Sequence, residues 1–191
     1  MAERPTPTRA ELLASRGAVI PDLIADDLAI LLVGINPSLW SGWAGLHFAR
    51  PGNRLWRTLH GAGLTDRVLD PSDTDELLAA GIGITNLVAR STARADELHS
   101  DELRAGRLGV ERLVRNRRPK VVAFLGVSAF RIAYENPRAT VGKQDGGIGR
   151  ALVWVLPNPS GLNAHYQQPA LNSAYSELRA FAGPRHDTLR S

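Results

Sequence analysis

The chain has 191 residues, of which 43% are hydrophobic and 22% charged, and it carries a formal net charge of +4 and no cysteine. This length predicts a single domain, residues 1–191, with its core at about 10–182 and a polar tail at 183–191, and such a domain buries a sizeable core without disulfides or metals. The absence of cysteine excludes thiolate zinc sites, thiol nucleophiles and thiol redox chemistry. No segment has the pattern of a signal peptide or a membrane span, so we expect a cytoplasmic protein that does not associate with membranes.

The positive charge comes mostly from arginine, whose planar fork of donors suits phosphate groups. Nucleic acid is therefore a permitted partner. A composition rich in arginine and alanine is equally typical of a protein from a GC-rich genome, so charge alone leaves the two explanations open.

Along the chain, apolar spacing first predicts a helix over 8–16, where Thr8 and Glu11 have the spacing of a capping box. A strand over 28–33 follows, and its apolar run without polar alternation is typical of a strand covered on both faces. The segment 36–52 is rich in glycine and serine and is expected to be a loop, too long for a simple connector. Short helices are expected over 53–61 and 73–80.

The second half of the chain continues the alternation of strands and helices. Strands are predicted over 82–87, 120–125 and 151–156, and helices over 100–117, 128–134 and 171–181. The segment 142–149 is expected to be a glycine-rich turn before the last strand. Strands that alternate with helices indicate an α/β protein, a three-layer α/β/α sandwich with a mostly parallel central sheet.

Four predicted loops gather at the edge where the parallel strands end, at 34–51, 85–92, 126–128 and 157–166. Ligands of open α/β sheets bind in the crevice at this edge. Two of the loops carry Asn-Pro-Ser directly after an apolar strand, at 36–38 and 158–160. We therefore treat Asn36 and Asn158 as parts of one site.

Three separate motifs, present in the right order, give the chain a specific resemblance to a known family. They are Gly-Ile-Asn-Pro at 34–37, Phe-Ala-Arg-Pro-Gly-Asn-Arg-Leu-Trp at 48–56 and Leu-Pro-Asn-Pro-Ser-Gly-Leu at 156–162. Together with Gly-Ile-Thr-Asn-Leu-Val at 83–88, they resemble the mismatch-specific uracil/thymine DNA glycosylases, most of all the bacterial branch specific for G/U mismatches in double strands. The resemblance covers roughly residues 10–182.

This resemblance implies a uracil-DNA glycosylase-like fold, in agreement with the predicted sandwich. It implies a monofunctional DNA glycosylase that flips a mispaired uracil out of the duplex, hydrolyses its N-glycosidic bond and leaves an abasic site. The implied partner is double-stranded DNA containing a G/U or G/T mismatch, with thymine and ethenocytosine as further substrates. Neither a cofactor nor a metal is implied, and the protein is expected to act as a monomer.

At the reaction centre, the resemblance implies that Asn36 orients the attacking water as a neutral amide. Backbone donors around Ile35 and Phe48 would stabilise the departing base, which leaves as an anion. The Phe48 ring would stack on the extruded pyrimidine, with Ser38 and Asn86 as further base-binding residues.

The loop over 158–164 looks like the wedge of this family. Leu162 at its tip would fill the gap that a flipped base leaves in the duplex and so offset the cost of unstacking. The surrounding Asn158, Ser160, Gly161 and Asn163 would contact the guanine that has lost its partner.

The chain departs from the family pattern at three places. Ser38 stands where glycine is common, which narrows the water site or adds a hydroxyl to it. Asn163, Ala164 and His165 follow the wedge leucine where many relatives have arginine, so recognition of the guanine and tight binding of the product are expected to differ. Ala89 stands where an acidic residue is frequent.

Two other functions remain open from the residues themselves. Gly-Val-Ser-Ala-Phe at 126–130 follows a strand and is similar to a hydrolase nucleophile elbow, except that Phe130 replaces the closing glycine. A serine hydrolase of this kind would use Ser128 and His165. A non-catalytic module that binds damaged DNA is the other alternative, and release of a free base distinguishes it from a glycosylase.

Overall fold

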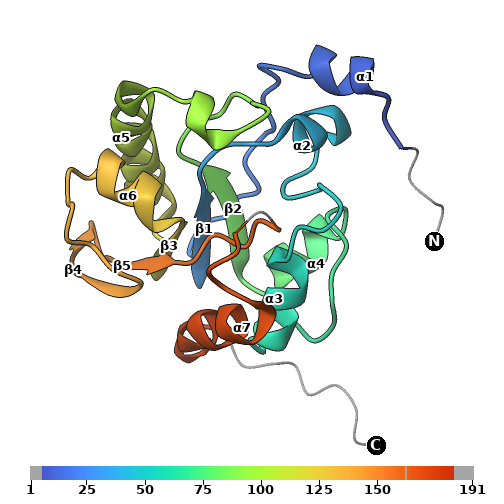
Figure 1. The fold of residues 1–191 in the computed structure, drawn as a ribbon. Helices are drawn as coiled ribbons and strands as arrows, with labels where there is room; N and C mark the ends of the chain where they lie inside the picture. The colour runs from blue at the N-terminus through green and yellow to red at the C-terminus, as the bar shows by residue number, and fades with distance from the viewer. Residues whose placement is uncertain (1–5, 162, 183–191) are drawn as a thin grey trace, which may run out of the picture.

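The computed structural model describes residues 6–161 and 163–182. At its centre lies a five-stranded sheet in the order β2-β1-β3-β5-β4 (Figure 1). Strands β2 (Ile82–Asn86), β1 (Ile30–Gly34), β3 (Val121–Leu125) and β5 (Ala151–Leu156) are parallel neighbours, and β4 (Gly142–Ile148) pairs antiparallel with β5 at the edge. The mostly parallel sheet predicted from the sequence is confirmed.

The described residues also form α-helices and short 3-10 helices. These are α1 (Arg9–Ala14), α2 (Leu39–Ala44), α3 (Leu55–Gly61), α4 (Thr74–Ala79), η1 (Ala95–Glu97), α5 (Ser100–Arg117), α6 (Val127–Ala133), α7 (Gln168–Ser176) and η2 (Glu177–Ala180). The capping box predicted at the start of α1 is present, because the Glu11 amide donates to Thr8 Oγ1 at 3.2 Å and the Thr8 amide donates to Glu11 Oε2 at 2.7 Å.

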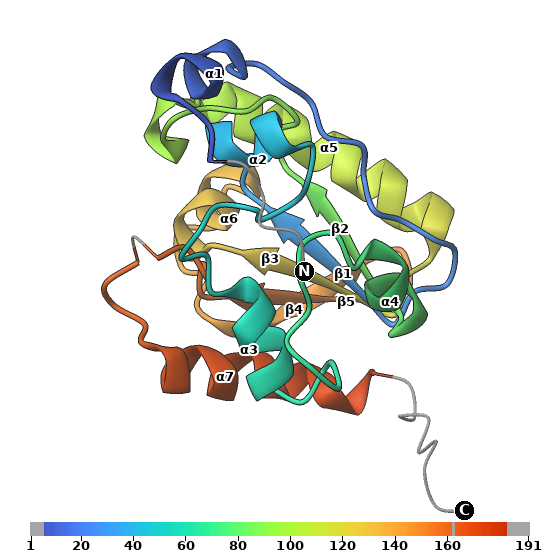
Figure 2. The same ribbon diagram turned by 90° about the vertical axis from the view of Figure 1, so that its right-hand side faces the viewer.

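Two layers of helices cover the two faces of the sheet (Figure 2), and alternate residues of β1, β3 and β5 pack in different core clusters. On one face, Ile30 and Leu32 of β1 pack in a cluster with α3, α4 and α7. On the other face, Leu31 and Val33 pack in a cluster with α5 and α6. All five residues of β1 are buried, as expected for a strand covered on both sides. The result is the three-layer sandwich that the sequence predicted.

The prediction of a glycine-rich turn over 142–149 is wrong, because most of this segment is the strand β4. β4 forms a hairpin with β5, in which Ile148 lies opposite Ala151. The pairing register shifts between Lys143 and Gly147, and Gly146 has a positive φ of 79°. The glycines therefore permit the irregular backbone of an edge strand, in which one side of the backbone has no neighbouring strand to pair with.

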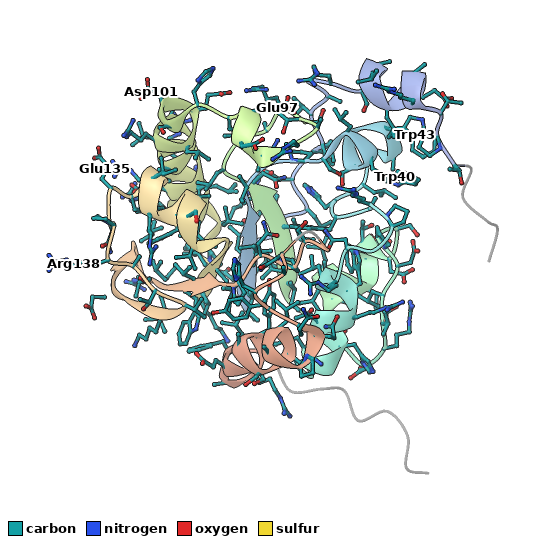
Figure 3. All side chains as sticks on the ribbon, viewed as in Figure 1. Trp40, Trp43, Glu97, Asp101, Glu135 and Arg138 are labelled. Atoms are coloured by element: carbon teal, nitrogen blue, oxygen red, sulfur yellow. The ribbon has the colours of Figure 1, made fainter. Side chains whose placement is uncertain are left out.

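The prediction of a loop over 36–52 is also wrong in part, since this segment contains α2. Ser38 is the N-cap of α2, and its hydroxyl accepts a hydrogen bond from the Ser41 amide at 3.1 Å. On α2, the rings of Trp40 and Trp43 meet edge to face, with centroids 6.0 Å apart (Figure 3). A serine directly before Leu39 was the local signal for this helix.

The last helix begins earlier than predicted, at Gln168, with a proline in its first turn. It continues as the 3-10 helix η2 after Ser176. The predicted polar tail at 183–191 lies outside the described residues. Within the part of the chain that the structure describes, no helix is both long and apolar enough to cross a membrane.

Candidate active site

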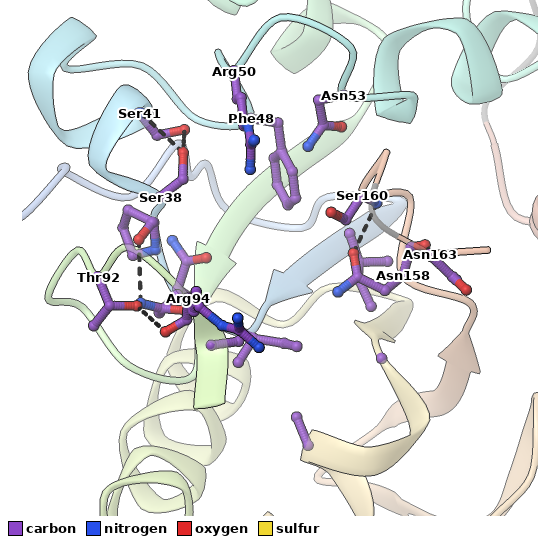
Figure 4. A pocket seen from close by; sticks show the side chains of 18 of the residues that line it. Ser38, Ser41, Phe48, Arg50, Asn53, Thr92, Arg94, Asn158, Ser160 and Asn163 are labelled. Atoms are coloured by element: carbon purple, nitrogen blue, oxygen red, sulfur yellow. Dashed lines mark hydrogen bonds between the residues drawn. The ribbon is translucent and has the colours of Figure 1, made fainter. Parts of the chain in front are cut away.

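A cavity of about 580 Å³ opens at the carboxyl ends of the parallel strands (Figure 4). Residues from all four loops that were expected at this edge line it. The lining includes the predicted site residues Ile35, Asn36, Ser38, Phe48, Asn86, Asn158, Ser160 and Asn163. Gly161 lies in a smaller neighbouring depression with residues 50–53, and Leu162 lies outside the described residues.

The carboxamide of Asn36 is held in one orientation. Its Nδ2 lies 2.7 Å from Thr92 Oγ1, 3.1 Å from the Arg90 carbonyl and 3.2 Å from the Pro37 carbonyl. Carbonyl oxygens only accept hydrogen bonds, so the nitrogen must face them and cannot exchange places with the oxygen. Oδ1 accepts no hydrogen bond from any described residue, and it remains available to a molecule in the cavity.

Thr92 is the closest of the three partners of Asn36, and the sequence analysis did not single it out. Its side chain is 2% exposed, and its hydroxyl donates to the Arg94 carbonyl at 2.7 Å. With its hydrogen committed to that carbonyl, Oγ1 can only accept from Asn36. The backbone of Thr92 also bonds with Pro37 and Leu39, at 3.1 Å in each case, so the loop after β2 is joined to the loop after β1 at this point.

Ser38 contributes to the site through the start of α2. Its hydroxyl caps the helix and also lies 3.1 Å from the Ser41 hydroxyl. Ser41 Oγ in turn accepts a hydrogen bond from the Ala49 amide at 3.2 Å. Ser38 therefore stabilises the segment that carries the neighbouring Phe48, in addition to lining the cavity.

Phe48 occupies the left-handed region, with a φ of 50°, which is uncommon for a residue other than glycine. Its carbonyl accepts a hydrogen bond from Trp56 Nε1 at 3.2 Å, and this bond together with the Ala49 contact holds the strained backbone. Figure 4 shows the Phe48 ring directed into the cavity. The backbone amides of Ile35 and Phe48 have no hydrogen-bond acceptor among the described residues.

Gly34, at the end of β1, forms the floor beneath Phe48 and Asn86. A Cβ atom at this position would lie 2.4 Å from Asn86 Oδ1 and 3.1 Å from Phe48 Cζ. Any larger residue would displace the Asn86 amide. The Phe48 ring and the Asn86 carboxamide thus both lie against Gly34. Together they present an apolar surface beside a polar group.

Asn86 is in contact with His47, a residue that the sequence analysis also passed over. His47 is 8% exposed, and its Nε2 lies 3.0 Å from the Pro21 carbonyl. Burial lowers the pKa of His47, which favours the neutral ring, and the Pro21 carbonyl requires the proton to sit on Nε2. The unprotonated Nδ1 therefore accepts from Asn86 Nδ2, at 3.4 Å.

The asparagines of the loop after β5 are bonded within the loop. Asn158 Oδ1 accepts from the Ser160 amide at 2.9 Å, and Asn163 Nδ2 donates to the Asn158 carbonyl at 2.9 Å. Asn163 Oδ1 accepts from the His165 amide at 3.1 Å. These side chains define the shape of the loop while lining the cavity.

The cavity does not have the geometry of the alternative enzyme, a serine hydrolase. Ser128 and His165 both line it, but no hydrogen bond joins them in the described residues. Its described lining contains no Asp or Glu, and acidic residues such as Asp101 and Glu135 lie toward α5 and α6 (Figure 3). Across the described ranges, no group of three or more potential metal ligands comes together.

Comparison with known proteins places the chain in a family. The family model of the uracil DNA glycosylase superfamily matches residues 21–179. The chain is also similar to the solution NMR structure of a candidate uracil DNA glycosylase from Methanosarcina acetivorans, with a TM-score of 0.57 and 17% sequence identity. That match covers 85% of this chain and 98% of the other, and it supports the fold. Since the family match spans most of its length, the chain belongs to the uracil DNA glycosylase superfamily and is a DNA glycosylase, a hydrolase.

Proposed function

We propose that the protein belongs to the mismatch-specific branch of this superfamily and removes uracil mispaired with guanine from double-stranded DNA. Thymine and ethenocytosine opposite guanine are secondary substrates. The protein acts as a monomer, with the whole chain as one domain. The observation that carries the proposal is the fixed carboxamide of Asn36, whose nitrogen has three acceptors and whose oxygen is available to the cavity.

Asn36 Oδ1 orients the attacking water by accepting one of its hydrogen atoms. An amide oxygen is a weak base, so the water stays protonated until positive charge has developed at the sugar. No carboxylate lines the described cavity, and a strong general base is therefore absent from this mechanism. A modest rate of hydrolysis follows, because the water is positioned without being deprotonated in advance.

The departing base receives its stabilisation from backbone groups. Cleavage of the N-glycosidic bond leaves the pyrimidine as an anion whose charge is shared by its ring nitrogen and its carbonyl oxygens. The amides of Ile35 and Phe48, which have no acceptor among the described residues, donate to those oxygens. Preorganised donors of this kind stabilise the transition state more than the ground state.

Phe48 and Asn86 form the slot for the extruded base. The Phe48 ring stacks on the pyrimidine, and the Asn86 carboxamide meets its polar edge over Gly34. His47 holds Asn86 Nδ2, so Oδ1 of Asn86 has a defined direction toward the ligand. A fixed pattern of one donor and one acceptor favours uracil over a base with the opposite pattern.

The loop after β5 enters the duplex at the position that the flipped base has left. Leu162 fills the space that the base has left, and the backbone of the Asn158–Asn163 segment meets the unpaired guanine. Since the side chains of Asn158 and Asn163 bond within the loop, they support its shape more than they read the opposite base.

The test is a panel of duplexes containing uracil opposite guanine, uracil opposite adenine, thymine opposite guanine and ethenocytosine opposite guanine. After incubation, alkali cleaves the strand at abasic sites, and the products are separated by length. We expect the fastest cleavage with uracil opposite guanine. Equal rates opposite guanine and adenine would remove the mismatch preference from the proposal, whereas binding without release of any base would support the non-catalytic alternative.

A further inference from the structure

The side chain of Arg54, the N-cap residue of α3, forms several hydrogen bonds with the loop after β5. Its Nη1 donates to the Tyr166 carbonyl at 2.6 Å, and its Nη2 donates to the carbonyls of Ser160 at 2.6 Å and Asn163 at 2.9 Å. Its backbone amide donates to the Pro159 carbonyl at 3.0 Å. One residue thus satisfies four carbonyl groups of a segment whose described residues form no helix or strand.

Only an arginine can make this set of bonds. A guanidinium presents five N–H groups in a rigid plane, whereas a lysine ammonium is a point charge on a flexible stem. Within the described residues, no carboxylate lies within ion-pair distance of Arg54. The positive charge of its guanidinium is therefore stabilised by the backbone carbonyl groups to which it donates. From α7, the buried Tyr175 adds a further bond, since its hydroxyl donates to the Pro157 carbonyl at 3.0 Å.

The first turn of α3 also holds the residue that stacks on the base. Trp56, two residues after Arg54, donates from Nε1 to the Phe48 carbonyl at 3.2 Å. The loop that precedes α3 also touches the loop after β5 directly, because a Cβ atom on Gly161 would lie 2.8 Å from the Gly52 carbonyl oxygen. Asn53 and Ser160 lie near each other in Figure 4, and both line the smaller depression that contains Gly161.

We propose that Arg54 is a positioning residue that preorganises the loop at 159–166 for entry into the DNA duplex, and that the first turn of α3 couples this entry to capture of the flipped base by Phe48. This inference rests on the proposed function. A loop that is already ordered loses little conformational entropy when it enters the duplex, whereas a loose loop must be ordered at that moment. The effect of Arg54 is therefore confined to substrates in which a base pair must be opened.

The experiment compares Arg54→Ala and Arg54→Lys with the matched control Arg131→Ala. Arg131 likewise donates from its guanidinium to a loop carbonyl, that of Ala139 at 2.8 Å, but it belongs to α6 and does not line the cavity. Single-turnover excision of uracil is measured on a G/U duplex and on the same uracil-containing single strand, and thermal unfolding is recorded for each variant.

We expect Arg54→Ala to slow duplex excision roughly 10-fold to 100-fold, the scale of a misplaced reacting element, and to change single-strand excision by less than about 3-fold. Arg54→Lys should fall between the wild type and Arg54→Ala, and Arg131→Ala should leave both rates unchanged. Combined with Leu162→Ala, Arg54→Ala should cost little more on the duplex, because both changes remove the same step.

Equal slowing of both substrates, or no slowing of the duplex reaction in a folded variant, would overturn the proposal. If Arg54→Ala does not fold, the same two rates of Arg54→Lys decide the matter. A wild type that excises no uracil refutes the proposed function instead. A wild type that excises uracil with an unchanged ratio of rates in the Arg54 variants refutes only this inference.

Discussion

His47 Nδ1 accepts a hydrogen bond from the Asn86 carboxamide, with 3.4 Å between the two nitrogens, and this contact requires a neutral imidazole. The other ring nitrogen donates to the Pro21 carbonyl at 3.0 Å. A proton on Nδ1 would face the NH₂ group of Asn86 and force the amide to turn. The protonation state of the buried His47 is thus linked to the orientation of the Asn86 amide, the polar group of the proposed base slot.

The His47 contact predicts how stability depends on pH. Burial lowers the pKa of His47 below its ordinary value of 6.5, with the Pro21 hydrogen bond and the charge of Asp22 acting in the opposite direction. Below about pH 6.5 the unfolded chain binds a proton that the folded chain resists, so the free energy of unfolding falls as the pH decreases toward the folded-state pKa. Urea unfolding at about pH 7.5 and about pH 5.5 measures this loss. His47→Gln should lose less stability over the same interval, and equal losses in both proteins would contradict the assignment.

Asn36→Ala tests the water-orienting residue. Removing the only polar side chain that is proposed to hold the nucleophile should lower the single-turnover rate by roughly 100-fold or more, the scale of losing one preorganised group at a reacting centre. Binding to a G/U duplex should persist, because the cavity and the loop after β5 are unchanged. Asn136→Ala, which replaces an exposed loop residue that does not line the cavity, is the control. Full activity in Asn36→Ala would remove the central residue of the mechanism.

Thr92 should act through Asn36. Thr92→Val keeps the shape of the side chain but removes the hydroxyl that lies 2.7 Å from Asn36 Nδ2. Excision should slow by roughly 5-fold to 10-fold, which corresponds to about 1 kcal/mol for one neutral hydrogen bond. Thr92→Ser retains the hydroxyl and should restore most of the rate. An equal defect in the two variants would mean that the methyl group, and not the hydrogen bond, is important.

Leu162→Ala tests the wedge on two substrates. Loss of the leucine should slow excision from a duplex more than from a single strand, by roughly 1–3 kcal/mol, comparable with part of the unstacking cost. Asn36→Ala should impair both substrates alike, because it acts on the chemical step. If Leu162→Ala slows both substrates equally, or neither, the loop after β5 is not the wedge.

Much of the architecture could be predicted from local patterns. The apolar run that became β1 has no polar alternation, and in the structure all five of its residues are buried between two helical layers. Because parallel strands end at the same edge, the positions of Asn36 and Asn158 after two such strands were enough to predict a shared cavity. The capping box of Thr8 and Glu11 is local chemistry and needed no tertiary information.

The wrong prediction of a turn over 142–149 is a case in which a distant partner outweighs local propensity, whereas the helix α2 missed within 36–52 has a local signal in Ser38. Residues 142–148 contain several glycines and form a strand only because β5 supplies the hydrogen-bonding partner. In the site, Thr92 and His47 carry no motif, and their roles come from contacts with Asn36 and Asn86 across sequence separations of 56 and 39 residues. Arg54 lies within a recognised motif, yet its bond to Tyr166 spans 112 residues. Hydrogen bonds are directional over about 3 Å, so these roles are decided only when the packed sheet brings its loops to one edge.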